Sequence, residues 1–312
     1  MTIFRSPAEV PASFGPSAVT IGNFDGVHAG HRQIMRQLKS PGLTPVVLTF
    51  DPHPAKVLAP DRAPKLLMTM AQRLRAFESE GIQAVLLLPF STDLAALTPE
   101  EFVRQVLVGT LKARLVLVGE DFRFGHKQAG NIDTLRTLGR QYGFEVSPIA
   151  PIEQRHERIS SSRVRKLVTE GAVSRACRML GAPFALEGEV VKGQGIGSKQ
   201  TVPTLNLAPR NETLPKSGVY VTRTRDIDST REWPSITNVG YRPTFNGKEL
   251  TIETFLLGPF DGSSPQKIEV KFLAFVRDER KFDTPEDLKK QILRDASVAI
   301  RLHRRLSGLG MY

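Results

Sequence analysis

The chain has 312 residues, about twice the length of a common single domain, so two separate hydrophobic cores are expected. Its 40% hydrophobic and 24% charged residues are typical of a folded globular protein and exclude a chain that is disordered throughout. Lys and Arg number 43 against 32 Asp and Glu, and the net charge of +11 favours polyanionic ligands, nucleotides and nucleic acids alike, without choosing between them.

The only cysteine, Cys177, excludes an intramolecular disulfide and a zinc site built from several thiolates, which fits a reducing compartment. Residues 1–16 lack the apolar core of a signal peptide. No segment approaches the roughly 18 apolar residues of a membrane span. We therefore expect a cytoplasmic protein with no membrane partner, and the sequence leaves self-association open.

In the first half, short β-rich apolar runs alternate with longer helical patterns. This alternation predicts a doubly wound α/β domain with a parallel sheet, which binds ligands beyond the carboxyl ends of its strands. One helix start is clear, because Thr98 can cap, Pro99 suits the first turn and Glu101 completes a capping box. The expected strands are Ala18–Gly22, Thr44–Phe50, Ala84–Leu88, Leu115–Gly119 and Phe144–Pro148.

The pattern changes after residues 162–180, which read as two short helices separated by Gly171. We place a domain boundary between residues 182 and 183, where Gly and Pro interrupt the pattern. Beyond it, β-rich runs between turns predict an antiparallel β-barrel closed by a helix over residues 285–306. The expected barrel strands are Phe184–Val191, Gly218–Arg225, Ile236–Val239, Leu250–Leu257 and Ile268–Val276, and the helix residues expected to face them are Leu288, Ile292, Ala296, Ala299 and Ile300.

The most informative segment lies where the first strand ends and a helix begins, and it reads Gly22-Asn23-Phe24-Asp25-Gly26-Val27-His28-Ala29-Gly30-His31. Its glycines allow a ligand to approach the backbone closely, and the helix N-terminus offers free N–H groups. His28 and His31 share one helix face and can donate hydrogen bonds to phosphate oxygens as charge builds there. Two histidines that only pack remain the alternative, and a zinc site would need further ligands. The segment predicts a cradle for nucleotide phosphates.

Three further segments follow predicted strands or precede a predicted helix, where the loops of such a sheet converge. They read Thr49-Phe50-Asp51-Pro52-His53-Pro54, Val118-Gly119-Glu120-Asp121-Phe122-Arg123-Phe124-Gly125 and Ile159-Ser160-Ser161-Ser162-Arg163-Val164-Arg165. Together with the first segment, they resemble the bacterial bifunctional riboflavin kinase/FAD synthetase family. The N-terminal half of that family is a Rossmann-like nucleotidyltransferase of the His-x-Gly-His type. The resemblance spans almost the whole chain.

The resemblance implies that residues 1–182 are an FMN adenylyltransferase in which His28 and His31 are catalytic. It assigns ATP binding to Gly22, Asn23, Phe24, Asp25, Gly30, Arg158, Ser161, Ser162 and Arg165, and flavin binding to Phe50, Pro52, His53, Pro54, Asp121, Phe122 and Phe124. Each assignment has a plainer alternative: a proline-rich turn that ends a strand, two phenylalanines that pack a loop, or an ordinary helix cap.

The second half carries four segments that together resemble the riboflavin kinase half of the family: Gly193-Gln194-Gly195-Ile196-Gly197, Pro203-Thr204-Leu205-Asn206, Asn238-Val239-Gly240-Tyr241-Arg242-Pro243-Thr244-Phe245 and Ile252-Glu253-Thr254-Phe255. The resemblance implies that residues 183–312 phosphorylate riboflavin. Thr204 and Asn206 would then hold the Mg²⁺ of ATP, and Glu253 would act on the substrate hydroxyl. It also assigns ATP binding to Gly193, Gly197, Lys199, Thr204 and Asn206.

The kinase half departs from the family pattern in the loop before Pro203. The family has Arg, Gly and Phe where this chain has Ser198, Thr201 and Val202. Lys199 can replace the charge of the missing arginine but not its planar fork. The alternative for Thr204 and Asn206 is that they are ordinary turn residues.

The main prediction is a bifunctional enzyme that makes FMN from riboflavin and FAD from FMN, with ATP and Mg²⁺ and without a nucleic-acid partner. One rival is an FMN adenylyltransferase whose barrel has lost kinase activity, which the altered loop suggests. The other is a nucleic-acid-binding protein, which the basic charge and the small barrel suggest. That rival lacks the interleaved aromatic side chains on which bases would stack.

Overall fold

The computed structural model describes residues 1–154, 157–191, 204–244, 247–260 and 263–308. The chain forms two compact units, one of Met1–Lys65 with Met70–Ser160 and one of Leu66–Thr69 with Ser161–Tyr312. The short segment Leu66–Thr69 joins the second unit through backbone contacts, since the N–H of Thr213 donates to Leu66 O at 3.0 Å. Within the described residues, no helix combines the length and apolarity that crossing a bilayer requires.

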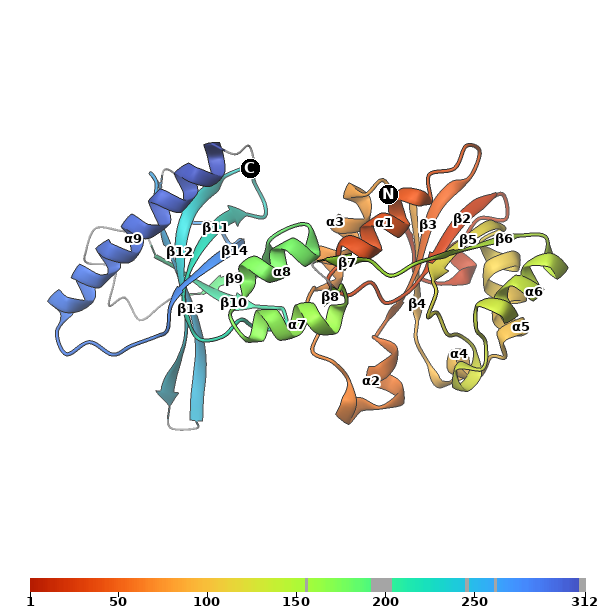
Figure 1. Cartoon of the computed structure of the whole chain (residues 1–312), viewed down its shortest axis with the longest axis horizontal. Helices are drawn as coiled ribbons and strands as arrows, with labels where there is room; N and C mark the ends of the chain where they lie inside the picture. Colours follow the sequence, from red (N-terminus) through yellow and green to blue (C-terminus); the bar gives the residue numbers. More distant parts are fainter. Residues whose placement is uncertain (155–156, 192–203, 245–246, 261–262, 309–312) are drawn as a thin grey trace. The chain divides into compact units, whose positions relative to one another are not determined.

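A parallel six-stranded sheet forms the centre of the first unit, in the order β1-β4-β3-β2-β5-β6 (Figure 1). After the short edge strand β1, the chain enters the middle of the sheet at β2, proceeds outward through β3 to β4, which lies beside β1, and then continues on the other side of β2 with β5 and β6. The order therefore reverses at β2. The strands are β1 (Thr2–Phe4), β2 (Ser17–Ile21), β3 (Thr44–Asp51), β4 (Ala84–Pro89), β5 (Ala113–Gly119) and β6 (Glu145–Ile149).

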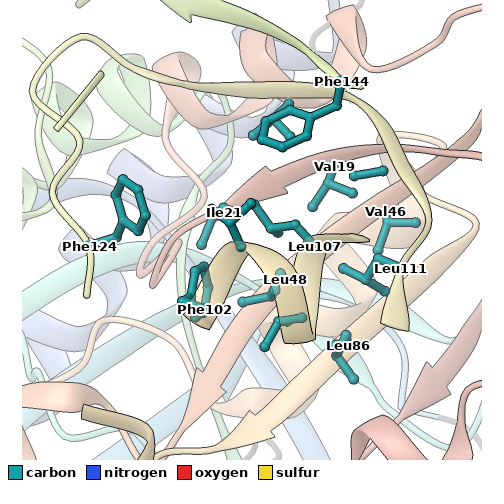
Figure 2. Packing of buried hydrophobic residues seen from close by; sticks show 14 of the residues in the cluster. Val19, Ile21, Val46, Leu48, Leu86, Phe102, Leu107, Leu111, Phe124 and Phe144 are labelled. Carbon is teal, nitrogen blue, oxygen red and sulfur yellow. The ribbon is translucent and has the colours of Figure 1, made fainter. Parts of the chain in front are cut away.

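Helices cover both faces of this sheet, and the central strands β2, β3 and β4 are therefore buried on both sides. On one face, apolar strand residues meet the helical segment that follows Thr98, where the capping box is present as predicted. Figure 2 shows this core, in which Val19, Ile21, Val46, Leu48 and Leu86 of the strands gather with Phe102, Leu107 and Leu111. The helices are α1 (Ala29–Gln37), α2 (Pro54–Leu58), α3 (Met70–Ser79), α4 (Thr92–Ala96), α5 (Pro99–Phe102), the π-helical η3 (Val103–Thr110) and α6 (Ile132–Tyr142).

The predicted fold class is confirmed in both halves. In the second unit, six antiparallel strands close into a barrel in the order β10-β13-β12-β11-β14-β9. Its elements are α7 (Ser161–Thr169), α8 (Val173–Leu180), β9 (Phe184–Val191), β10 (Thr204–Pro209), β11 (Gly218–Asp226), β12 (Glu232–Thr244), β13 (Gly247–Leu256), β14 (Lys267–Arg277) and α9 (Pro285–Gly308). Sequence analysis did not predict β10, because its residues were interpreted only as a binding motif.

Helix α9 packs on the barrel along a line that matches the predicted one only in part. Ala299 is fully buried and contacts the core together with Leu302 and Leu306, whereas Leu288 and Ile300 are 39% and 38% exposed. The orientation predicted for Leu288 and Ile300 was therefore wrong. The physical reason is that two polar residues, Asp295 and His303, occupy the buried line.

Both polar residues have partners that compensate for their burial. The carboxylate of Asp295 accepts hydrogen bonds from Arg277 at 2.8 and 3.0 Å. The Nε2 atom of His303 lies 3.0 Å from the carbonyl oxygen of Thr222. An apolar-periodicity argument could not find this helix face, because part of the face is hydrophilic.

The close approach of β9 to β10 predicts a sharp stability effect at Gly188. A Cβ atom there would lie 1.8 Å from the backbone oxygen of Ala208. We expect Gly188→Ala to lower the free energy of unfolding of the barrel by about 3 kcal/mol or more, because two backbones would have to separate. Urea unfolding followed by the fluorescence of Trp233, the only tryptophan, measures this.

Gly258→Ala is the matched control, because a Cβ atom at Gly258 would meet nothing within 4 Å. The control should change stability by less than about 0.5 kcal/mol. Equal unfolding midpoints for the two variants would contradict the prediction.

Candidate functional site

Three of the predicted segments follow neighbouring strands of the parallel sheet at their carboxyl ends. Gly22–His28 follows β2, Pro52–Pro54 follows β3, and residues 120–125 follow β5. Because β2 pairs with both β3 and β5, these loops leave the same edge of the sheet on either side of the point where the strand order reverses. This edge is where doubly wound sheets bind ligands.

The loop after β2 has an unusual backbone. Phe24, Gly26 and Val27 have φ values of +50°, +84° and +40°, and this left-handed region is costly for a β-branched residue such as valine. The ring of Phe24 is buried and packs edge-on against His31, with ring centroids 5.1 Å apart, and against Phe77 at 5.8 Å. Strain of this kind persists only where the surroundings fix the conformation, and it concentrates at ligand-binding sites.

His28 and His31 lie together at the start of α1. Their rings stack with centroids 3.6 Å apart and planes 17° from parallel. His28 is the N-cap of α1, and its Nδ1 accepts a hydrogen bond of 3.4 Å from the backbone N–H of His31. Because Nδ1 accepts, a neutral His28 carries its proton on Nε2, so this N–H can donate to a ligand.

Burial keeps both imidazoles uncharged. Desolvation lowers the pKa of His28 to about 4, although a backbone hydrogen bond acts in the opposite direction. Desolvation also lowers the pKa of His31 well below its usual value, and the neighbouring His28 adds to this effect. At neutral pH the pair can therefore offer N–H donors rather than positive charge.

Sequence analysis missed one residue of this region, Arg73 in α3. Its side chain is only 2% exposed, and its Nη1 donates a hydrogen bond of 2.8 Å to the backbone oxygen of Asn23 in the loop after β2. The only signal in the sequence was an arginine within an amphipathic helix, and most such residues face solvent.

The predicted flavin residues divide between the loop after β3 and the loop after β5. His53 is the N-cap of α2, since its Nδ1 accepts from the N–H of Ala55 at 3.1 Å, and Phe50 packs against Phe90. Phe122 is partly exposed and stacks on Phe124, which is 7% exposed within the core. Phe124 thus supports Phe122 from beneath.

The remaining predicted residues of the first site occupy two places. Arg158 forms an ion pair with Asp121, and both side chains are exposed. Ser161, Ser162 and Arg165 lie in α7, which belongs to the second unit by its contacts.

Strand register gathers the predicted kinase residues on one face of the barrel. Asn206 of β10 lies directly opposite Glu253 of β13, and Glu253 also lies opposite Asn238 of β12. Directly paired residues share a sheet face, and Thr204 joins them two residues before Asn206. All four side chains are partly buried. Gly193, Gly197 and Lys199 lie outside the described residues.

The opposite face of the same strands points into a polar interior. Thr254 is fully buried, and its hydroxyl lies 2.7 Å from that of Thr237, which in turn lies 2.7 Å from that of Thr222. These hydroxyls satisfy one another inside the barrel. The alternation of β13 therefore places Glu253 outside and Thr254 inside.

Known proteins match both halves of the chain. A family model described as FAD synthetase matches residues 11–163, and one described as riboflavin kinase matches residues 180–303. Bifunctional riboflavin kinase/FMN adenylyltransferases of Escherichia coli K12 and Pseudomonas fluorescens are each 34% identical over 285 residues, which is 90% of this chain and 91% of theirs. The chain belongs to this family.

A solved structure supports the fold assignment of this family member. The crystal structure of a macrolide-efflux protein from Streptococcus pneumoniae matches it with a TM-score of 0.84 and 28% identity. The match covers 95% of this chain and 97% of that chain. The stacked histidines lie within the segment that matches the FAD synthetase model, and Thr204, Asn206 and Glu253 lie within the segment that matches the riboflavin kinase model.

The lowered pKa of His28 makes stability depend on pH. Above pH 6.5 the imidazole of His28 is neutral in both the folded and the unfolded chain. Below pH 6.5 the unfolded chain binds a proton there, whereas the folded chain binds it only near pH 4. The free energy of unfolding therefore falls as pH drops from 7 to 5. His28→Asn, which keeps a capping acceptor, should reduce this fall by about 2 kcal/mol. Urea unfolding followed by circular dichroism at both pH values checks this.

His126→Asn provides the comparison, because His126 is exposed. If the free energy of unfolding falls as much between pH 7 and pH 5 in His28→Asn as in His126→Asn, then His28 does not resist protonation in the folded state.

Proposed function

We propose that this enzyme phosphorylates riboflavin to FMN in its barrel unit and adenylylates FMN to FAD in its α/β unit, using ATP for both reactions. The observation that carries the proposal is that a single chain matches bifunctional relatives across both halves. In each half, residues suited to the respective reaction also lie on one loop or one sheet face. The substrates are small molecules, and no nucleic acid takes part.

In the α/β unit, a phosphate oxygen of FMN attacks the α-phosphorus of ATP, and the bond to pyrophosphate breaks. The attacking oxygen is already anionic, so no general base is needed. Alignment and charge stabilisation supply the catalysis. The Nε2–H of His28 donates to phosphate oxygens as charge accumulates on the leaving pyrophosphate, and His31 acts beside it.

The loops that follow β2, β3 and β5 hold the two substrates of this reaction. Gly22, Asn23, Phe24, Asp25 and Gly30 surround the nucleotide, and a Cβ atom at Gly30 would lie 3.3 Å from the ring of His28. Arg158, which pairs with Asp121, contacts its phosphates. Phe122, Asp121 and the loop of Phe50, Pro52, His53 and Pro54 contact the flavin, with Phe124 behind them.

In the barrel unit, the 5′-hydroxyl of riboflavin attacks the γ-phosphorus of ATP, and ADP leaves. This hydroxyl must lose its proton, and Glu253 accepts it. Thr204 and Asn206 are suited to holding Mg²⁺, because a hydroxyl and an amide oxygen are hard donors and both residues lie on the face that carries Glu253. When bound there, Mg²⁺ would supply positive charge to offset the negative charge of the transferring phosphoryl group. Gly193, Gly197 and Lys199 complete ATP binding in this proposal.

A cytoplasmic location fits both reactions, because ATP is supplied there and the lone Cys177 needs no oxidising compartment. Product chromatography with riboflavin, ATP and Mg²⁺ tests the whole proposal. FMN and then FAD should accumulate. If supplied FMN is adenylylated but riboflavin stays unchanged, the chain is an adenylyltransferase only. Salt-dependent RNA binding without ATP turnover would support the nucleic-acid alternative instead.

Two substitutions should separate the reactions. Glu253→Gln removes the proton acceptor, so FMN formation from riboflavin should fall by roughly 10²- to 10⁴-fold while supplied FMN is still adenylylated. His28→Asn removes a phosphate donor, so FAD formation from FMN should fall by roughly 10²- to 10³-fold while the kinase reaction continues. Each variant is the control for the other. If either substitution depressed both rates equally in a folded chain, the assignment of that residue would be wrong.

A further inference from the structure

Arg73 carries a charge in a place where charge is costly. The residue lies on the inner face of α3, one turn before the fully buried Phe77, and only 2% of its surface is exposed. An ionised group persists in such surroundings only when hydrogen bonds and opposite charges compensate for the lost water. Within the described residues, the Nε–H of Arg73 is buried and has no hydrogen-bond partner. A buried polar group without a partner is rare in folded proteins, so this side chain needs an explanation other than packing of the fold.

The compensation comes from the two loops that carry the first site. The Nη1 group donates to the backbone oxygen of Asn23 at 2.8 Å, in the loop after β2. Burial lowers the pKa of Arg73, and the carboxylates of Asp25 and Asp51 counteract this effect. Asp25 is 4% exposed in the loop after β2, and Asp51 is the last residue of β3, before the predicted flavin loop.

The loop that Arg73 contacts cannot hold its conformation by local preference. Asn23 directly precedes Phe24, and both Phe24 and Val27 have positive φ values. Each such residue costs on the order of 1–3 kcal/mol, which the surroundings must offset. A bond from a charged donor to the Asn23 oxygen is among the stronger contacts available for this purpose.

The far end of the same helix fixes α1. Glu80 directly follows α3, and its carboxylate accepts from Arg32 at 2.5 Å and from Arg36 at 2.8 Å. Both arginines lie in α1, which begins immediately after His28. Helix α3 therefore holds the loop before α1 through Arg73 and the body of α1 through Glu80.

We propose that Arg73 is a positioning residue for FMN adenylylation. It holds the loop of residues 22–28 in the conformation that presents His28 to ATP, and it keeps this loop in place relative to Asp51 and the flavin loop. The inference rests on the proposed function of the α/β unit. It adds a residue that touches neither substrate and acts through Asn23, Asp25 and Asp51.

Three variants of the full-length enzyme test this role. Arg73→Met removes the charge and the donor at similar length, Arg73→Lys keeps the charge without the planar fork, and Arg75→Met makes the same change at an exposed position of α3. Steady-state rates of FMN adenylylation and riboflavin phosphorylation are measured with each, together with the thermal unfolding midpoint. The kinase reaction in the same chain serves as an internal control.

We expect Arg73→Met to raise the KM for ATP in adenylylation and to lower kcat/KM by roughly 10- to 100-fold. Its KM for ATP in the kinase reaction should match that of Arg75→Met. Arg73→Lys should recover part of the loss, because an ammonium can still donate to the Asn23 oxygen.

Two outcomes would overturn the proposal. If Arg73→Met adenylylates FMN with the same kcat and the same KM for ATP as Arg75→Met, a positioning role is excluded. A fall in kcat and in the unfolding midpoint, with KM unchanged and no recovery in Arg73→Lys, would show that the residue serves only the fold. A wild-type enzyme that makes no FAD from FMN would instead refute the proposed function itself, so the two failures are distinguishable.

Discussion

The first site depends on the removal of water from the start of α1. Desolvation keeps His28 and His31 neutral, and a neutral imidazole with Nδ1 engaged has one N–H to offer. Two charged histidines stacked at 3.6 Å would repel each other and also the positive end of the helix dipole. Neutrality allows both rings to lie at the helix N-terminus, where the proposed reaction would bring phosphate oxygens.

This arrangement needs a rigid support, because the left-handed backbone at Phe24 and Val27 is unfavourable by itself. Phe24 fills the space beneath the histidines, where its ring meets His31 on one side and Phe77 of α3 on the other. Polar contacts from the same helix reach Asn23 and α1. The apolar and the polar support of the loop thus both come from α3 and the residue that follows it. Because this support fixes the imidazole N–H donors in advance, little free energy is lost to their reorganisation when charge develops on a substrate.

The sequence predicted the elements better than their contacts. The five strands β2 to β6 were expected within a few residues, because each is a β-rich apolar run, and the structure buries both faces of the central strands β2, β3 and β4. The motif around His28 was also visible, since its glycines and histidines stand between a strand and a helix. The role of Arg73 was not visible in the sequence, because its side chain contacts a loop that lies 50 residues away in the chain. Asp295 and His303 of α9 were missed for the same reason: burial of a polar residue is decided by a distant partner.

The two sites hold their residues by different means, and this difference bears on the altered kinase loop. The first site uses a strained turn, whereas the kinase residues lie in a regular strand. Asn206 is paired on both sides, with Val191 of β9 and Glu253 of β13 opposite it, and Thr204 lies opposite Phe255 of β13. A slip of one residue would turn every side chain of β10 to the other face and bury the wrong set, so the register is strongly specified. The departures at Ser198, Thr201 and Val202 precede this ladder. In the proposed kinase site they would affect how ATP is held, but the strand pairing keeps Thr204, Asn206 and Glu253 together. This favours an active kinase over a barrel that has lost its function.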